Sequence, residues 1–213
     1  MTLEAAPRSH EHLAIAVGPR LRIRHKVRED AIDDFSWRTD AENARFDGGA
    51  PFSDGFERFL RQFDYDQAFG GADKRTFSIE TVGGTHIGNV TYYHGDTAAG
   101  SVEFGIGIGR DEYRNQGLGT EAAIVFLRYV WANTPFRLVY LHTLEWNERA
   151  RACFRYAGFD DASRVLREGT MFVRMDARRE WWTLWDTEGR FEALIDRRAG
   201  NAVPGRAAEA PLA

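Results

Sequence analysis

The stretch Glu103-Phe104-Gly105-Ile106-Gly107-Ile108, followed by Arg114-Asn115-Gln116-Gly117-Leu118-Gly119-Thr120, decides the fold of this chain. It predicts a strand that runs into a glycine-rich turn, and a helix that begins near Thr120. Such a turn leaves backbone N–H groups without helical partners. Together with the positive end of the helix dipole, these groups form a site for a phosphate or pyrophosphate. Glycines in the turn let the backbone approach the anion without a Cβ in the way, so the sequence predicts a phosphorylated cofactor.

Two common phosphate-binding motifs do not fit this turn. A dinucleotide-binding fold needs G-x-G-x-x-G directly after the first strand of a parallel unit. Here Arg110 stands where the third glycine would follow Gly105 and Gly107, and the neighbouring segments read as antiparallel hairpins. A nucleotide P-loop needs a Lys after its last glycine, whereas Thr120 follows Gly119.

Composition bounds the class of protein. The chain has 213 residues with 43% hydrophobic content, enough for the core of one domain. Its net charge of -4, with both signs mixed, argues against nucleic-acid binding, which calls for a basic stripe. The single cysteine, Cys153, excludes a disulfide framework, and the scattered histidines lack metal-ligand spacing, so we expect no metal. The chain shows no membrane-length apolar run and no secretory signal, so we expect a cytoplasmic protein without membrane contact.

The order of elements predicts one α+β domain. We expect a flexible lead-in over residues 1–18, the domain over 19–182, a C-terminal extension over 183–199 and a disordered tail over 200–213. Asp30 to Arg45 has helical character, and Pro51 opens a second helix with Ser53 or Asp54 as its cap. The extension is compatible with a helix or an added strand, and its tryptophans with sheet packing or a homodimer contact.

Three motifs in order carry a family resemblance. They are Arg114-x-x-Gly117-x-Gly119 after a strand, Asn147-x-x-Ala150 at the start of a helix, and Ala157-Gly158-Phe159 at its end. This set resembles the Gcn5-related N-acetyltransferase (GNAT) superfamily over about Leu21 to Trp182. The spacing to Glu180-Trp181 is most similar to the ribosomal-protein-alanine (RimJ/RimL-type) N-acetyltransferases.

The resemblance implies a mixed, mostly antiparallel sheet of six to seven strands, flanked by helices and splayed between its fourth and fifth strands. Acetyl-CoA would lie in that opening as cosubstrate, with its pyrophosphate on the turn and its pantetheine arm along the strand and on Asn147. The family Tyr that protonates the leaving thiolate is replaced by a phenylalanine. The implied cofactor-binding residues are Ile106, Ile108, Arg114, Asn115, Gln116, Gly117, Leu118, Gly119, Thr120, Asn147 and Phe154.

Two residues are candidates for the catalytic base that a protonated amine acceptor requires. Glu103 is the first, because it shares one face of its strand with a row of glycines that would leave a channel open. The alternative is a solvated or Arg-paired glutamate. His142, on the strand that leads to Asn147, is the second, because imidazole titrates near neutral pH. The alternative is a structural histidine. Cys153 reads as packed core rather than as a covalent nucleophile.

The sequence thus predicts an acetyl-CoA-dependent N-acetyltransferase that acts on a primary amine by direct attack through a ternary complex. The acceptor is open between a protein N-terminus, a polyamine, an amino acid and an aminoglycoside-like small molecule. The alternative function is a non-catalytic acyl-CoA sensor that keeps the cleft without turnover.

Overall fold

The computed structural model describes residues 10–70 and 74–200, with side chains to residue 196. Within these residues, eight strands form one sheet in the order β1-β2-β3-β4-β5-β6-β8-β7. The strands are β1 (Ala14–Val17), β2 (Leu21–His25), β3 (Lys74–Thr81), β4 (His86–Asp96), β5 (Ser101–Ile108), β6 (Leu138–Leu144), β7 (Asp160–Arg167) and β8 (Thr170–Arg178). The helices are α1 (Asp30–Thr39), α2 (Ala41–Phe46), α3 (Phe56–Phe69), α4 (Leu118–Asn133), α5 (Glu148–Tyr156), α6 (Arg179–Thr187) and α7 (Arg190–Gly200), with short 3-10 turns η1 (Glu11–Leu13) and η2 (Asp111–Tyr113).

The α+β prediction is confirmed, with more strands than the six to seven expected. Part of the predicted lead-in forms β1, which pairs antiparallel with β2 through Ala16 and Ile23. The extension over 183–199 is helical, since it holds the end of α6 and most of α7. The predicted tail falls at the end of α7 and on residues 201–213, which lie outside the described part of the chain.

The first helical region differs from the prediction in two places. The helix expected from Asp30 to Arg45 divides at Asp40, whose carboxylate accepts a hydrogen bond from the backbone N–H of Asn43 at 2.8 Å and so caps α2. The cap predicted at Ser53 or Asp54 is wrong, because α3 begins after Gly55 and has no side-chain cap. Ser53 and Asp54 lie within two residues of Gly55, and a sequence predicts that a helix exists more reliably than the residue at which it begins.

Helix α4 covers one face of the sheet and holds the main core. The run from Ala122 to Leu127 is buried on all sides, as its uniformly apolar sequence predicts. Phe126 stacks on Phe104 of β5 with 5.6 Å between ring centroids. Glu121, a buried glutamate in the first turn of α4, is paired with Arg20 at 2.7 Å. Together these contacts hold the N-terminus of α4 beside the end of β5.

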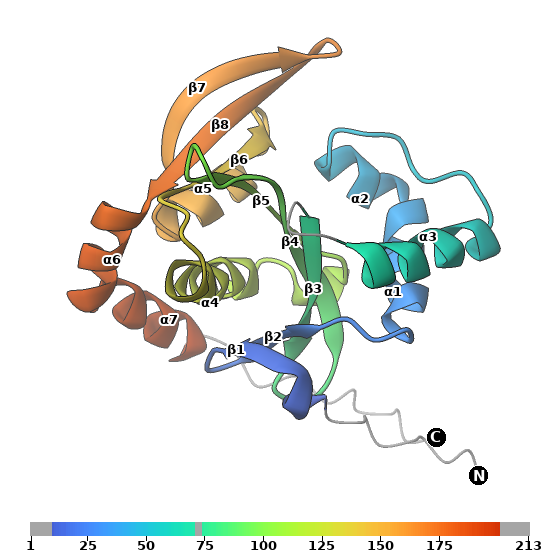
Figure 1. Ribbon diagram of the computed structural model, residues 1–213, viewed down its shortest axis with the longest axis horizontal. Coiled ribbons are helices and arrows are strands. Elements are labelled where there is room, and N and C mark those ends of the chain that lie inside the picture. Colours follow the sequence, from blue (N-terminus) through green and yellow to red (C-terminus); the bar gives the residue numbers. More distant parts are fainter. Residues whose placement is uncertain (1–9, 71–73, 201–213) are drawn as a thin grey trace, which may run out of the picture.

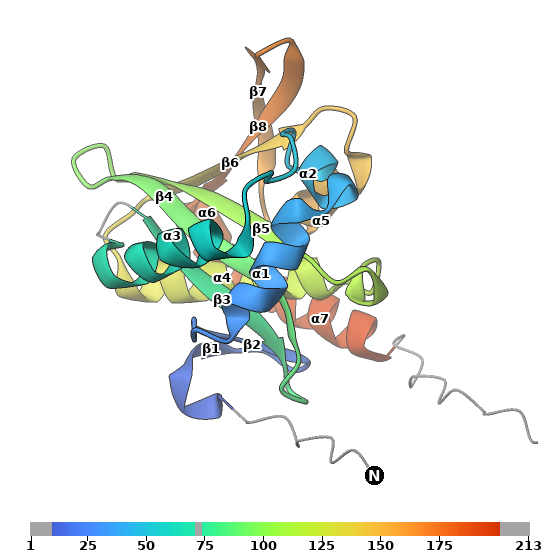
Figure 2. The same cartoon turned by 90° about the vertical axis from the view of Figure 1, so that its right-hand side faces the viewer.

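Helices α1, α2 and α3 lie over the opposite face (Figures 1 and 2). Buried charges attach α1 to the sheet: Arg24 of β2 pairs with Asp30 at 2.8 Å and with Glu80 at 2.6 Å. Lys26 pairs with Asp34 at 2.6 Å. Removing one member would leave an uncompensated buried charge, so this network fixes where α1 and α2 stand over β4 and β5.

The sheet opens between β5 and β6, its one parallel pair among the described strands. Their register runs from Ser101↔Leu138 to Glu103↔Tyr140 and then ends, although both strands continue. This is the splay implied by the resemblance, moved from the fourth and fifth strands to the fifth and sixth because β1 is added to the sheet. Past Glu103, the β6-facing edge of β5 is open to a ligand.

Candidate active site

The turn between β5 and α4 has the backbone geometry of an anion cradle. Gly117 is the N-cap of α4 with φ 76°, and Asn115 is a non-glycine residue with φ 60°. The first backbone bond of the helix runs from the N–H of Glu121 to the carbonyl of Gly117, at 3.1 Å. The N–H groups of Leu118 and Gly119 precede it and therefore point out of the helix end. No side-chain cap fills this position, which leaves it open to a phosphate.

The guanidinium of Arg114 is bonded to other protein groups, so its role at the cradle is structural support. Its Nε donates to the carbonyl of Ile108 at 3.1 Å, and its Nη1 lies 2.7 Å from Asp111. Its Nη2 donates to Asn43 of α2. Only 9% of the side chain is exposed. Arg114 therefore ties the end of β5, the turn and α2 together, and it contacts the backbone of Ile108, near which the resemblance places pantetheine.

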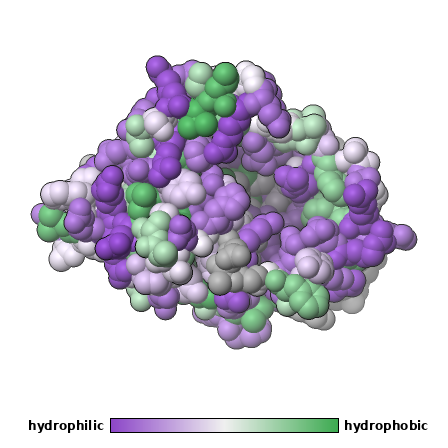
Figure 3. All heavy atoms as spheres, turned by 45° about the horizontal axis from the view of Figure 1, so that its top comes forward, coloured by the Kyte–Doolittle hydropathy of each residue, from purple (hydrophilic) through white to green (hydrophobic). Residues whose placement is uncertain are grey.

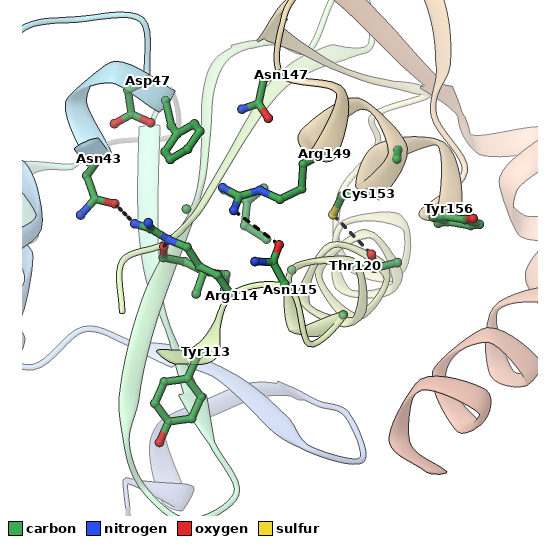
Figure 4. Close-up of a pocket in the computed structure, with 17 residues that line it drawn as sticks. Asn43, Asp47, Tyr113, Arg114, Asn115, Thr120, Asn147, Arg149, Cys153 and Tyr156 are labelled. Carbon is green, nitrogen blue, oxygen red and sulfur yellow. Dashed lines mark hydrogen bonds between the residues drawn. The ribbon is translucent and has the colours of Figure 1, made fainter. Parts of the chain in front are cut away.

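The cradle opens into a cavity of about 380 Å³, which we call the cofactor cavity. It lies between α2, the turn and α5, as the labelled side chains in Figure 4 show. Phe46 of α2 stands at its edge between the guanidinium groups of Arg149 and Arg114, 4.7 and 5.6 Å from its ring centroid. Eight predicted cofactor-binding residues line it, namely Ile106, Ile108, Arg114, Asn115, Gly117, Gly119, Thr120 and Asn147.

Asn147 caps α5 as predicted, since its Oδ1 accepts from the N–H of Ala150 at 3.1 Å. Its side-chain NH₂ is the group left for a ligand in the cofactor cavity. Three predicted cofactor-binding side chains do not line this cavity. Leu118 is core at 5% exposure, the Gln116 side chain donates back to the carbonyl of Glu112, and Phe154 packs edge-on against Phe104 with centroids 6.4 Å apart. For Gln116 and Leu118 the backbone N–H is the remaining route to a ligand.

Cys153 and Tyr156 line the cofactor cavity, whereas the sequence placed Cys153 in packed core. The Cys153 thiol is partly exposed and accepts from the hydroxyl of Thr120 at 3.3 Å. The apolar stripe of α5 predicts the side of the helix on which Cys153 lies. It does not predict the cavity that the opening of the sheet leaves beside that side. The side of the stripe nearest α4 therefore faces a cavity rather than core.

A second cavity of about 720 Å³ lies on the other side of β5, and we call it the acceptor cavity. Trp37, Phe172, Phe154, His94 and His142 are among its lining residues. Figure 3 shows the surface hollowed between the β7–β8 hairpin and the helices α1, α2 and α3. The two cavities share a boundary at β5 and α2, formed by Asn43, Phe46, Asp47, Ile106, Gly107 and Ile108.

Glu103 and His142, the two catalytic candidates, are in direct contact across the base of the splay. The Nδ1 of His142 lies 2.7 Å from one carboxylate oxygen of Glu103. The other oxygen lies 3.1 Å from the Nδ1 of His94, a residue that the sequence analysis missed. His94 sits at an irregularity in β4 with φ 54°, a conformation that is uncommon outside glycine. One buried carboxylate thus holds two imidazoles that line the acceptor cavity.

The surroundings keep Glu103 ionised. Burial on its own would raise the pKa of Glu103, but hydrogen bonds from His142 and His94 outweigh it, and the net pKa lies below its ordinary value. Nearby, burial and the charge of Glu103 raise the pKa of Tyr93 to about 12. Since an ionised carboxylate only accepts hydrogen bonds, the Nδ1 of His142 is its donor, and the Nε2 of the neutral ring keeps a lone pair.

The comparisons agree with this geometry. The model of the acetyltransferase (GNAT) domain family matches residues 20–160. A spermidine N-acetyltransferase from Vibrio cholerae, solved with CoA and spermine, has 19% identity and a TM-score of 0.70 over 78% of this chain and 99% of that one. AAC(6')-Ib in complex with ribostamycin and coenzyme A has 15% identity and a TM-score of 0.66 over 76% and 96%.

A GNAT-family acetyltransferase from Bacillus anthracis has 14% identity and a TM-score of 0.66 over 78% of this chain and 98% of that one. At these identities the likeness concerns the fold. No curated protein matches the chain in sequence. In the described part of the chain, no helix is long and apolar enough to cross a membrane. Those same residues hold no group of three or more His, Cys, Asp or Glu side chains able to bind a metal ion.

Proposed function

The chain belongs to the acetyltransferase (GNAT) domain family, and we propose on this premise that it moves an acetyl group from acetyl-CoA directly to a primary amine in the acceptor cavity. The observation that carries the proposal is the boundary at which the two cavities meet, along Ile106, Gly107 and Ile108 of β5. A donor in one cavity and an amine in the other would face each other there. Direct attack through a ternary complex requires that arrangement.

The residues of the cofactor cavity fit acetyl-CoA. The αL conformations of Asn115 and Gly117 support this, because a turn of that kind would present backbone N–H groups to a diphosphate. The open edge of β5 and the side-chain NH₂ of Asn147 offer partners to an amide-bearing arm. Acetyl-CoA, when bound, supplies an acetyl group activated as a thioester.

We assign the base to His142 and an orienting role to Glu103. A carboxylate whose pKa is held below its ordinary value is a weak proton acceptor at neutral pH. The same carboxylate fixes the His142 tautomer, so that Nε2 accepts the proton of the incoming ammonium. As the positive charge forms on the ring, the buried carboxylate stabilises it.

Two further steps, stabilisation of the acetyl oxygen and protonation of the leaving thiolate, are assigned to a backbone N–H and to water. A backbone N–H on the open edge of β5 would donate to the developing negative charge on the acetyl oxygen. Phe154 has no hydroxyl, so we assign protonation of the leaving thiolate to water.

The similarity to the ribosomal-protein-alanine N-acetyltransferases rests on the Glu180-Trp181 spacing, and a protein N-terminus therefore stays among the acceptors to be tested. A homodimer through the C-terminal aromatic segment, where Trp181 is 54% exposed, stays a prediction.

The proposal is tested by following free CoA with a thiol reagent while the protein is incubated with acetyl-CoA and a panel of amines. The panel contains amino acids, polyamines, aminoglycosides and short peptides with free N-termini. We expect at least one amine class to raise CoA release well above the rate without amine, with acetylated product confirmed by mass spectrometry. Tight acetyl-CoA binding with no amine-stimulated release by any class would favour the acyl-CoA sensor instead.

A further inference from the structure

Arg167, at the end of β7, reaches the catalytic pair from outside the cavity. Its Nη2 lies 3.1 Å from both ring nitrogens of His142, and its guanidinium carbon is 5.7 Å from the ring centroid of Phe172. His142 and Phe172 both line the acceptor cavity. The hairpin β7–β8 that carries Arg167 extends beyond the rest of the sheet (Figure 1). A permanent positive charge therefore stands at the rim of the cavity, directly beside the proposed base.

Among the described residues, no carboxylate forms an ion pair with Arg167 at contact distance. Its close contacts are with His142 and the Phe172 ring, and its charge also helps to lower the pKa of Glu103, the carboxylate that the two histidines already share. By contrast Arg164, on the same strand but the opposite face, is neutralised by Glu145 at 2.6 Å. Arg167 thus keeps donors in a fork geometry that suits a carboxylate.

The charges that line the cavity leave little attraction for a polycation. Asp34 is neutralised by Lys26 at 2.6 Å, and Asp47 lies 4.0 Å from Arg38, which also lines the cavity. Lys74, also in the lining, is paired with Asp66 at 3.5 Å. An acceptor that carries only positive charges would meet Arg167 next to the atom that must deprotonate it, and like charges at that distance repel.

We propose that the acceptor is an amine that also carries a carboxylate, bound by Arg167, one or two carbons from the reactive nitrogen. This inference rests on the proposed function and names its substrate class. The two anchoring groups are within hydrogen-bonding distance of each other, so the ammonium and the carboxylate of the ligand must be close together. An α-amino acid meets that condition, whereas a polyamine and the N-terminus of an ordinary peptide do not.

The carboxylate would also expose the base. In the free protein, Nη2 of Arg167 lies 3.1 Å from both ring nitrogens of His142, so a positive charge stands beside the imidazole that must accept the proton. A guanidinium can form two parallel bonds to a carboxylate, with attraction between two full charges, whereas a neutral imidazole offers neither. The ligand carboxylate therefore draws the guanidinium away from the imidazole, and Nε2 becomes available to the amine. An amine without a carboxylate leaves Arg167 in place.

The test compares three acceptors that share one side chain: an α-amino acid, its carboxamide and its decarboxylated amine, with spermidine as a fourth. Each kcat/KM is corrected for the fraction of neutral amine. We expect the wild-type enzyme to prefer the amino acid, and Arg167→Gln to reduce its kcat/KM by roughly 10- to 100-fold, mainly through KM. The same substitution should leave the decarboxylated amine unchanged or improved. Arg164→Gln, an arginine outside both cavities, is the matched control and should leave every acceptor unchanged.

Two outcomes would overturn the inference while the acetyltransferase proposal survives. One is equal or better turnover of spermidine or of the decarboxylated amine by the wild-type enzyme. The other is an equal loss for all acceptors in Arg167→Gln, which would make Arg167 a positioning residue of His142 rather than a substrate-binding one. Absence of turnover with every amine, together with retained acetyl-CoA binding, would instead count against the proposed function. Circular dichroism and melting of both variants separate these results from misfolding.

Discussion

The two cavities on either side of β5 are built in different ways. The cofactor cavity takes its anion cradle from consecutive residues, Asn115 to Gly119, and from backbone N–H groups that the turn cannot satisfy internally. The acceptor cavity takes its chemistry from side chains on three strands, His94 of β4, Glu103 of β5 and His142 of β6. The difference teaches that one short segment can build the anion cradle, whereas the chemistry of the acceptor cavity depends on the pairing of three strands. Substitutions should therefore separate the two halves of the reaction.

The largest difference between the effect on amine acetylation and the effect on acetyl-CoA binding is expected at His142. His142→Gln removes the proton acceptor and should lower kcat for amine acetylation by roughly 10²- to 10⁴-fold, as loss of a general base does. Acetyl-CoA affinity should stay within about two-fold, because His142 lines only the acceptor cavity. Steady-state kinetics and calorimetric titration with CoA measure the two quantities.

His94→Gln is the matched variant for this comparison. His94 contacts the same carboxylate but its side chain is 73% exposed, so its replacement should lower kcat only a few-fold. If the two variants were equally impaired, the proton would be shared across the Glu103 carboxylate. If His142→Gln kept more than about a third of wild-type kcat, His142 would be no base.

The reverse separation is expected at Gly117. Gly117→Val places a β-branched residue at φ 76°, a strained conformation, and adds atoms where the anion approaches. We expect acetyl-CoA affinity to fall by roughly 10- to 100-fold, which corresponds to loss of charged hydrogen bonds, with little change in amine KM. Isothermal titration with CoA measures the first, and kinetics at saturating acetyl-CoA the second.

Gly49→Val is the control for a general effect of replacing glycine near α2. A Cβ at Gly49 meets nothing within 4 Å and its φ is not in the left-handed region. CoA affinity of this variant should match the wild type. An unaltered affinity in Gly117→Val would show that the turn does not hold the diphosphate, and the comparison between the cavities would lose its first half.

The contrast also explains what the sequence could predict. The turn from Arg114 to Thr120 was readable because its geometry is set by local residues, and the cap at Asn147 for the same reason. His94 and Arg167 were not readable. Their approach to Glu103 and His142 depends on an irregularity in β4 and on the reach of the β7–β8 hairpin, which are set by pairing between distant strands. For Glu103, strand alternation predicts its face but not its two histidine partners, and our proposal of His142 as the base rests on those partners.

The smallest expected effect concerns the pH dependence of stability at the base of the splay. The folded-state pKa of Glu103 is lowered, so its contribution to the free energy of unfolding is present above the ordinary value of 4.5 and is lost as the pH falls through the folded pKa. Near pH 7, Glu103→Gln should therefore be less stable than the wild type by about 1–3 kcal/mol, the range for a hydrogen bond to a charged group. The deficit should shrink as the pH falls below 4.5, since the wild-type carboxyl then protonates. Urea unfolding at several pH values measures this difference in the free energy of unfolding.

The control is Glu148→Gln, which removes a glutamate that is 69% exposed and should change stability by less than about 1 kcal/mol at any pH. A deficit that stays constant down to the acid limit would mean that packing, rather than charge, links Glu103 to its two histidines, and the electrostatic account of the acceptor side would be wrong.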